Sequence, residues 1–245
     1  MRRFYKDVTV SPSPQPSPPS QGTRAWAREW AILLDGKPIQ TPARNALALP
    51  SRALAEAVAD EWREQGETIA PQTIPLTKLA NTAIDRVAPD RDASVARTLA
   101  YGRNDLLCYR AEAPADLVRR QSNTWGPLLA WAAERYGARL KVGTGIAHIA
   151  QPEYAIAALG KPLARLDAFG LAVAETAAMI SGSAVLALAL IEGRLDAEAV
   201  FAAADLDENA QAERWGRDAE AEARRRGLAV ELESAARFLA LRNKS

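Results

Sequence analysis

Two kinds of hydrophobic pattern divide this chain, and their order constrains its fold more than any other feature. Between Trp26 and Leu49, short apolar runs alternate with tight turns. One turn is Asp35-Gly36, a pair that favours a two-residue β-hairpin because both positions need positive φ. From Pro152 onward, apolar residues recur at helical spacing. Strands followed by helices predict an α+β fold, with a small N-terminal antiparallel-β-rich domain and a C-terminal α-helical domain.

We place the domain boundary between residues 145 and 146, so that 1–145 is the β-rich domain with helices and 146–245 the helical one. In the first domain, Asp105–Arg110 is expected to return to the sheet as a strand. In the second, one helix is expected over residues 207–226. The segment 11–22 contains the run SPSPQPSPPS, which predicts a loop or linker because proline removes backbone donors and favours extended geometry. A ligand for a proline-reading domain is the alternative for this segment.

The composition argues against several classes of function. The net charge of +1 gives no overall field that favours nucleic acid or an anionic membrane. A single cysteine, Cys108, and a single histidine, His148, exclude an internal disulfide, a cysteine zinc cluster and a two-histidine metal site. The apolar stretch Ala177–Ile191 is too short to span a bilayer. The N-terminus has no apolar run typical of a secretory signal. We therefore expect a bacterial cytoplasmic protein with no metal, cofactor, nucleic-acid partner or membrane insertion.

No catalytic motif is found in the sequence. A phosphate loop of the form GxxxxGK[ST], the GxSxG elbow and the HExxH helix are all missing. Cys108 stands in the apolar run LLCY, where cysteine usually behaves as a small buried hydrophobe rather than a nucleophile. Asn81 and Asp85 lie four residues apart on a helical pattern and have two possible roles: hydrogen bonds to nearby backbone, or a polar contact with a partner. We expect no catalytic residues.

A possible recognition surface lies further along the chain. In residues 205–222, a group of polar and aromatic residues recurs at steps of three and four and so shares one helical face: Glu208, Gln211, Trp215, Asp218 and Glu222. A solvated helix face is the alternative, because acidic residues such as Asp207 are favoured early in a helix by its dipole. Trp215 followed by Gly216 instead favours close packing or recognition.

Seven segments, in order and over nearly the whole chain, carry a resemblance to a known family. They read LDGKPIQTPARNALALP, LAEAVADEWREQGETI, IPLTKLANTAIDRV, DLLCYR, RRQSNTWGPLLAWAAERYG, GSAVLALAL and DENAQAERWGRDAEAE. Together they resemble the assembly chaperones of the F-type ATP synthase that bind the free alpha subunit of the catalytic sector. The proline-rich stretch is the departure from this pattern.

The resemblance implies a monomeric chaperone that binds the unassembled alpha subunit and prevents its aggregation without nucleotide, cofactor or catalysis. It implies a bacterial cytoplasmic location, and the mitochondrial matrix for eukaryotic relatives. It places an important acidic position at Glu208, with Asp207 as its neighbour, and a sensitive position at Trp62, whose helical spacing predicts a core side chain. The remaining signature or structural positions are Asn81, Asp85, Asp105, Cys108 and Arg110.

Two other functions remain as alternatives at this stage. One is a general scaffold that binds another client protein. The other is a small-molecule hydrolase that uses carboxylates as acid and base, with Asp85, Asp105 or Glu208 as candidates. Co-purification of the alpha subunit would distinguish the three.

Overall fold

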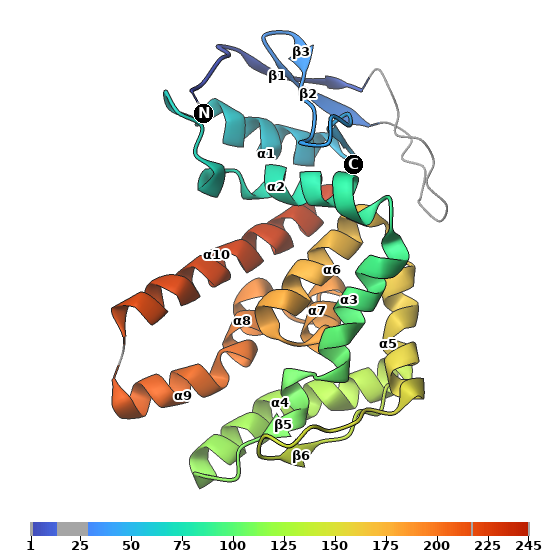
Figure 1. The fold of residues 1–245 in the computed structure, drawn as a ribbon, viewed down its shortest axis with the longest axis vertical. Helices are drawn as coiled ribbons and strands as arrows, with labels where there is room; N and C mark the ends of the chain where they lie inside the picture. The colour runs from blue at the N-terminus through green and yellow to red at the C-terminus, as the bar shows by residue number, and fades with distance from the viewer. Residues whose placement is uncertain (1, 14–28, 217, 245) are drawn as a thin grey trace. The chain divides into compact units, whose positions relative to one another are not determined.

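The computed structural model describes residues 2–13, 29–216 and 218–244 (Figure 1). Most of the expected linker 11–22 lies outside these residues. The described chain has a small antiparallel sheet near its N-terminus and helices over most of the remainder, which confirms the α+β prediction.

The sheet is built around β2 (Trp30–Leu34). It pairs antiparallel with β1 (Val8–Pro12) on one side and with β3 (Lys37–Pro38) and β4 (Ala48–Leu49) on the other. The predicted hairpin turn between β2 and β3 is confirmed, because Asp35 and Gly36 have φ of 48° and 78°.

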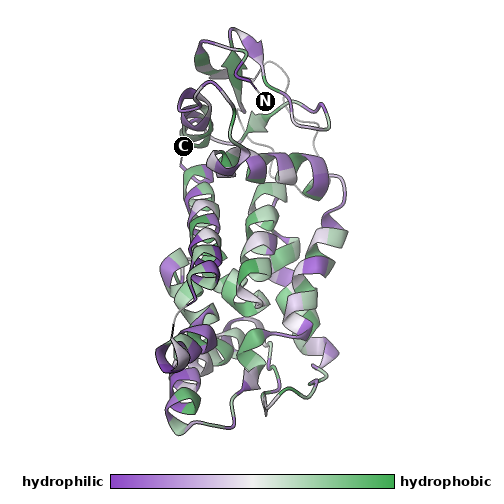
Figure 2. Ribbon diagram, turned by 60° about the vertical axis from the view of Figure 1, so that its left-hand side comes forward, coloured by the Kyte–Doolittle hydropathy of each residue, from purple (hydrophilic) through white to green (hydrophobic). Residues whose placement is uncertain are grey.

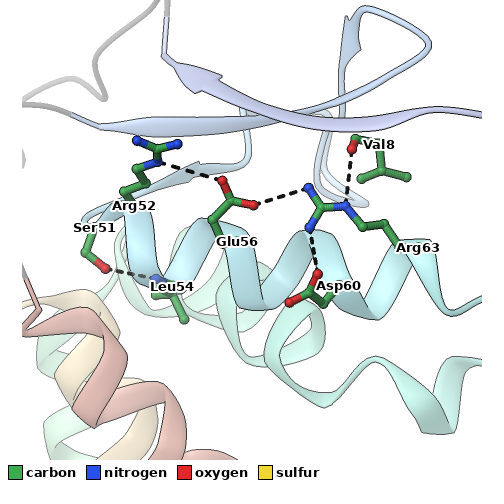
Figure 3. Close-up of polar contacts among 7 residues, drawn as sticks. All are labelled: Val8, Ser51, Arg52, Leu54, Glu56, Asp60 and Arg63. Carbon is green, nitrogen blue, oxygen red and sulfur yellow. Dashed lines mark hydrogen bonds and ion pairs between the residues drawn. The ribbon is translucent and has the colours of Figure 1, made fainter.

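Two helices follow the sheet. Helix α1 (Arg52–Arg63) is capped by the Ser51 hydroxyl, which accepts from the Leu54 amide at 3.1 Å. The side of α1 that faces the strands carries a chain of ion pairs, and Arg63 also donates to the Val8 carbonyl of β1 (Figure 3). Helix α2 (Pro75–Thr82) continues into the π-helical turn η2 (Ala83–Val87).

Glu61, on α1, joins these two helices. The Leu76 amide donates to its Oε1 at 2.6 Å, and the amide and hydroxyl of Thr77 donate to its Oε2 at 2.8 and 2.6 Å. This buried carboxylate satisfies the free amides at the start of α2, which begins with Pro75 and has no cap from its own preceding residue. Glu61 therefore fixes α2 against α1.

The rest of the chain is helical with short irregular connections. Its elements are α3 (Arg91–Arg103), α4 (Ala115–Tyr136), α5 (Glu153–Ala164), α6 (Ala168–Ser181), α7 (Ala184–Ile191), α8 (Ala197–Ala204), α9 (Leu206–Trp215) and α10 (Ala219–Arg242). Shorter elements are the 3₁₀ turns η1 (Pro71–Thr73) and η3 (Leu106–Cys108) and the strands β5 (Tyr109–Arg110) and β6 (Gly143–Thr144).

Most of these helices carry both hydrophobic and hydrophilic residues, as the mixed colours of Figure 2 show. Helix α7 is entirely apolar, and its residues 184–190 are buried, so it forms part of the core of the helical region. Among the described residues, no helix is both long and apolar enough to cross a membrane.

The described chain divides into two compact units, each assembled from separate segments. One unit contains residues 1–91, 166–173 and 234–245, and the other contains 92–165 and 174–233. The first unit thus includes the beginning of α6 and the end of α10. The division into a β-rich domain 1–145 and a helical domain 146–245 stays a prediction.

Two predicted elements were wrong. Asp105–Arg110 does not return to the N-terminal sheet: its first part is η3, and β5 pairs in parallel with β6. The cause is the Asp105 carboxylate, which accepts from the Leu107 amide at 3.1 Å and bends the backbone into a turn. The helix expected over 207–226 ends at Trp215, because Gly216 has φ 92° and ψ 172°, a conformation that only glycine adopts readily.

Candidate functional site

Helix α10 follows α9 after a short connection that starts at Gly216, and a half-buried arginine holds the two helices together. The Nε of Arg225, on α10, donates to Asp205 Oδ1 at 2.9 Å, and its Nη2 contacts both Asp205 Oδ2 and Asn209. Asp205 is buried just before α9, and Asn209 lies within α9. This ion pair therefore connects the start of α9 to the following helix.

The inner side of α9 is fixed to α4 by the buried Gln121. Its Nε2 donates to Asp207 Oδ1 at 2.7 Å, and its Oε1 accepts from the Ala111 amide at 2.8 Å. Arg110 donates to the Gln121 carbonyl at 2.5 Å and lies 5.0 Å from the ring centroid of Trp125. Arg110 and Asp207, which the sequence assigned to different roles, thus belong to one network, and it leaves the Asp207 carboxylate directed inward.

Two exposed ion pairs add to the contact between α9 and α4. Arg120 Nη1 lies 2.7 Å from Glu213 Oε2, and Arg214 Nη2 lies 3.0 Å from Asp116 Oδ1. Each contributes at most about 1 kcal/mol, because both partners are largely exposed to solvent. The buried Gln121 contacts are therefore the stronger determinant of how α9 is oriented.

Another side of α9 is exposed to solvent. We call Glu208, Gln211 and Trp215 the outer face of α9; they follow one another at steps of three and four residues. All three are exposed, and Trp215 has 78% of its surface accessible. An exposed tryptophan at the end of a well-anchored helix is available to bury its ring against another molecule.

Asp218 and Glu222 do not continue this face, contrary to the prediction of one shared surface. They lie beyond Gly216, where the helical phase is interrupted. Asp218 Oδ1 accepts from the Glu220 amide at 3.0 Å at the start of α10, and Glu222 Oε2 lies 4.0 Å from Arg226 Nη1. The hydrogen bond at the start of α10 explains the position of Asp218, and the ion pair with Arg226 along the surface of α10 explains that of Glu222.

The signature residues near η3 are buried in the second unit. Asp105 accepts from the amides of Leu107 and Val185, at 3.1 and 3.2 Å, and burial raises its pKa to about 6. Burial, followed by the neighbouring Asp105, raises the pKa of Cys108 to about 12, so the thiol stays protonated. Cys108 is buried while His148 is exposed.

The signature residues of the first unit also hold local structure. Asp85 accepts from the Thr41 hydroxyl at 2.6 Å, the Asn45 amide nitrogen at 2.9 Å and the Ala43 backbone at 3.0 Å. Burial opposes these hydrogen bonds, but they lower the pKa of Asp85 below its usual value. Of the two roles considered, Asp85 takes the structural one and fixes the 41–45 loop. Asn81 is half-buried on α2.

Trp62 is half-buried rather than a core residue, which corrects the prediction from helical spacing. Its indole Nε1 donates to Thr77 Oγ1 at 3.1 Å, and its ring lies 5.7 Å from that of Tyr5. The indole N–H needs a hydrogen-bond partner, which keeps this edge of the side chain close to polar groups.

Sequence reasoning missed two residues that position the candidate site. Arg225 gave no signal among the many charged residues of its segment. Gln121 did give one, because it is a polar residue on the apolar side of a long predicted helix, where its amide must find partners. Among the described residues, no group of three or more histidine, cysteine or acidic side chains could hold a metal ion.

Comparison with known proteins identifies the family. The model of the ATP12 chaperone protein family matches residues 2–133, more than half of the chain. The chain belongs to the ATP12 chaperone family. This is a family of ATP synthase assembly chaperones, as the resemblance predicted.

Relatives of this family extend the likeness to the whole chain. Protein atp12, mitochondrial, from Schizosaccharomyces pombe is 26% identical over 229 residues, which cover 87% of this chain and 79% of the relative. The crystal structure of Atp12 from Paracoccus denitrificans, also solved as an aspartate-to-lysine mutant, is 40% identical in sequence to this chain, with a TM-score of 0.87. The match covers 99% of this chain and 98% of the Paracoccus chain. A protein of Agrobacterium tumefaciens described as a chaperone is 42% identical with a TM-score of 0.88, covering 98% and 85%.

The buried Asp105 predicts a characteristic pH dependence of stability. Its pKa of about 6 in the folded protein exceeds the value of 3.8 expected when unfolded, so the folded state binds the proton more tightly. Its contribution to stability is therefore complete below pH 3.8 and lost as the pH rises through about 6. Relative to an Asp105→Asn variant, the wild type should gain about 2 kcal/mol between pH 7 and pH 4. Urea unfolding of both proteins across this range measures the difference; a constant difference would contradict the assignment.

Proposed function

We propose that this protein binds the unassembled alpha subunit of the ATP synthase catalytic sector and prevents its aggregation without using nucleotide. Membership of the ATP12 chaperone family supports an assembly role. The lack of a GxxxxGK[ST] phosphate loop in the sequence agrees with action that does not depend on ATP.

The outer face of α9 is the surface we assign to client binding. An unassembled subunit exposes the apolar surface that its partner will later cover, and such surfaces aggregate. Trp215 offers a large apolar ring for such a surface, and Glu208, two helical turns away on the same face, offers a carboxylate for a basic group. A chaperone at this position shields the client until the true partner displaces it.

One observation carries this assignment. Trp215 is 78% exposed on a helix whose inner side is anchored by Gln121 and Arg225. The ring is therefore presented by a fixed support, which lowers the entropy lost on binding. The carboxylates proposed for a hydrolase have other surroundings: Asp85 holds the 41–45 loop and Asp105 is fully buried.

Titration against separated subunits tests the proposal. The isolated alpha and beta subunits are each titrated with this protein by calorimetry, with nucleotide removed enzymatically and then restored. We expect saturable binding to alpha, no binding to beta, and the same affinity with and without nucleotide. Equal binding to both subunits would favour a general scaffold, and binding only with nucleotide would overturn the proposed mode of action.

A further inference from the structure

A second exposed apolar surface lies in the segment between α4 and α5. We call residues 139–151 the arm. Ile146 is 102% exposed and Val142 is 50% exposed, and Tyr154, just beyond the arm, is 59% exposed. Apolar side chains gathered on a protruding segment mark interaction sites more often than single exposed residues do.

The arm is held in place by several specific contacts. The Gln151 side chain pairs with the backbone of Lys141, accepting from its amide at 2.8 Å and donating to its carbonyl at 2.9 Å. A Cβ atom at Gly143 would lie 2.8 Å from the Cδ1 of Ile149, so a larger residue there would require the Ile149 side chain to move. The exposed residues therefore belong to a preformed structure.

Among the described residues, β6 pairs with another strand along one edge only, and we call its other edge the free edge. β6 pairs in parallel with β5, with Arg110 opposite Thr144, and the Gly145 amide donates to the Arg110 carbonyl at 2.9 Å. The backbone N–H and C=O groups of successive residues point alternately to the two sides of a strand. Those of Gly143 and Gly145, on either side of Thr144, point towards β5. The N–H and C=O of Thr144 therefore point away from β5, on the edge of the two-stranded sheet.

The charges near this edge indicate what it would bind. Arg139 and Lys141 are exposed at one end of the arm, and neither forms an ion pair within the part of the chain that the structure describes. At the other end, Glu112 Oε1 lies 3.3 Å from the position of a Cβ on Gly145. An added strand would thus meet apolar side chains along the edge and basic ones at its Arg139 end.

We propose that the free edge of β6 binds an extended peptide segment as a third strand. Apolar side chains of that segment pack beside Val142 and Ile146, and its acidic side chains lie near Arg139 and Lys141. Backbone hydrogen bonds to Thr144 supply register, as in other complexes formed by strand addition. This surface is independent of the outer face of α9, so it would give the chaperone a second point of contact and a gain in avidity.

Peptide binding to the intact protein tests the edge. The probe is a labelled peptide about eight residues long that alternates valine with glutamate, compared with one that alternates valine with lysine. We expect saturable binding of the glutamate peptide by fluorescence anisotropy and binding roughly tenfold weaker for the lysine peptide. Equal affinity for both peptides, or no binding of either, would overturn the proposal.

Variants at Thr144 locate the binding on β6. Thr144→Pro removes the outward N–H without removing a bond to β5, and it should weaken binding roughly tenfold. Thr144→Val keeps that N–H and should bind as the wild type does. If the thermal midpoint shows that the proline variant is unfolded, Ile146→Asp serves instead and should also weaken binding. Unchanged binding in the folded variants would exclude this edge.

A Trp215→Ala variant separates this proposal from the proposed function. It should bind the glutamate peptide normally even though it loses affinity for the alpha subunit. Loss of peptide binding in this variant would show that the peptide occupies the outer face of α9, and would overturn strand addition at β6.

Discussion

Replacing Glu61 with alanine should lower the free energy of unfolding by about 3 kcal/mol, the largest loss of stability that we expect from a single polar residue here. The substitution leaves three donors at the start of α2 without their acceptor: the amides of Leu76 and Thr77 and the hydroxyl of Thr77. Because burial also raises the pKa of Glu61 and so makes its charged form costly, the net loss is smaller than three separate hydrogen bonds would suggest.

Glu56 provides a matched control on the same helix. Its carboxylate lies 3.7 Å from Arg52 and 3.2 Å from Arg63, and it remains substantially exposed (Figure 3). Such surface ion pairs contribute little, so Glu56→Ala should cost less than about 1 kcal/mol. Urea denaturation of both variants makes the comparison. Similar losses for the two variants would show that Glu61 does not anchor α2.

Replacing Trp215 with alanine should weaken binding to the alpha subunit about 30-fold, which corresponds to about 2 kcal/mol for a tryptophan at the centre of an interface. Its thermal midpoint should stay that of the wild type, because the ring is 78% exposed and contributes little to the core. Glu208→Lys should also weaken binding, because it reverses the charge on the same face of α9, two helical turns from the ring. Calorimetric titration with the alpha subunit measures both effects.

Glu134→Lys is the control for the charge reversal. Glu134 is also exposed on a helix, but near the end of α4, about 20 Å along the helix from the residues that contact α9. Its reversal should leave the affinity for alpha unchanged. A Trp215→Ala protein that binds alpha normally, or a Glu208→Lys protein that fails to fold, would remove the outer face of α9 from the account.

Local sequence signals predicted much of the fold. Asp35-Gly36 specified the hairpin, and helical spacing specified most of the later helices. The two wrong predictions, a strand over residues 105–110 and one helix over residues 207–226, each failed at a single residue that can adopt more than one local structure. Gly216 can lie within a helix or end it, and Asp105 can lie in a strand or cap a turn. Periodicity alone does not distinguish these cases.

The candidate site was predicted less completely than the fold. The steps between Glu208, Gln211 and Trp215 correctly gave one helical face, because they depend only on helix geometry. The inward position of Asp207 depends on Gln121, 86 residues earlier in the chain. Pairing over that distance is set by tertiary packing, which single-sequence patterns do not contain.

The aggregation of the isolated alpha subunit tests the central claim most directly. Light scattering of beta-free alpha subunit is followed at a temperature where it aggregates, alone and with an equimolar amount of this protein, without nucleotide. We expect the wild type and Glu134→Lys to suppress scattering and Trp215→Ala not to suppress it. Equal scattering with and without the wild-type protein would contradict the chaperone function, and full protection by Trp215→Ala would contradict the assigned surface.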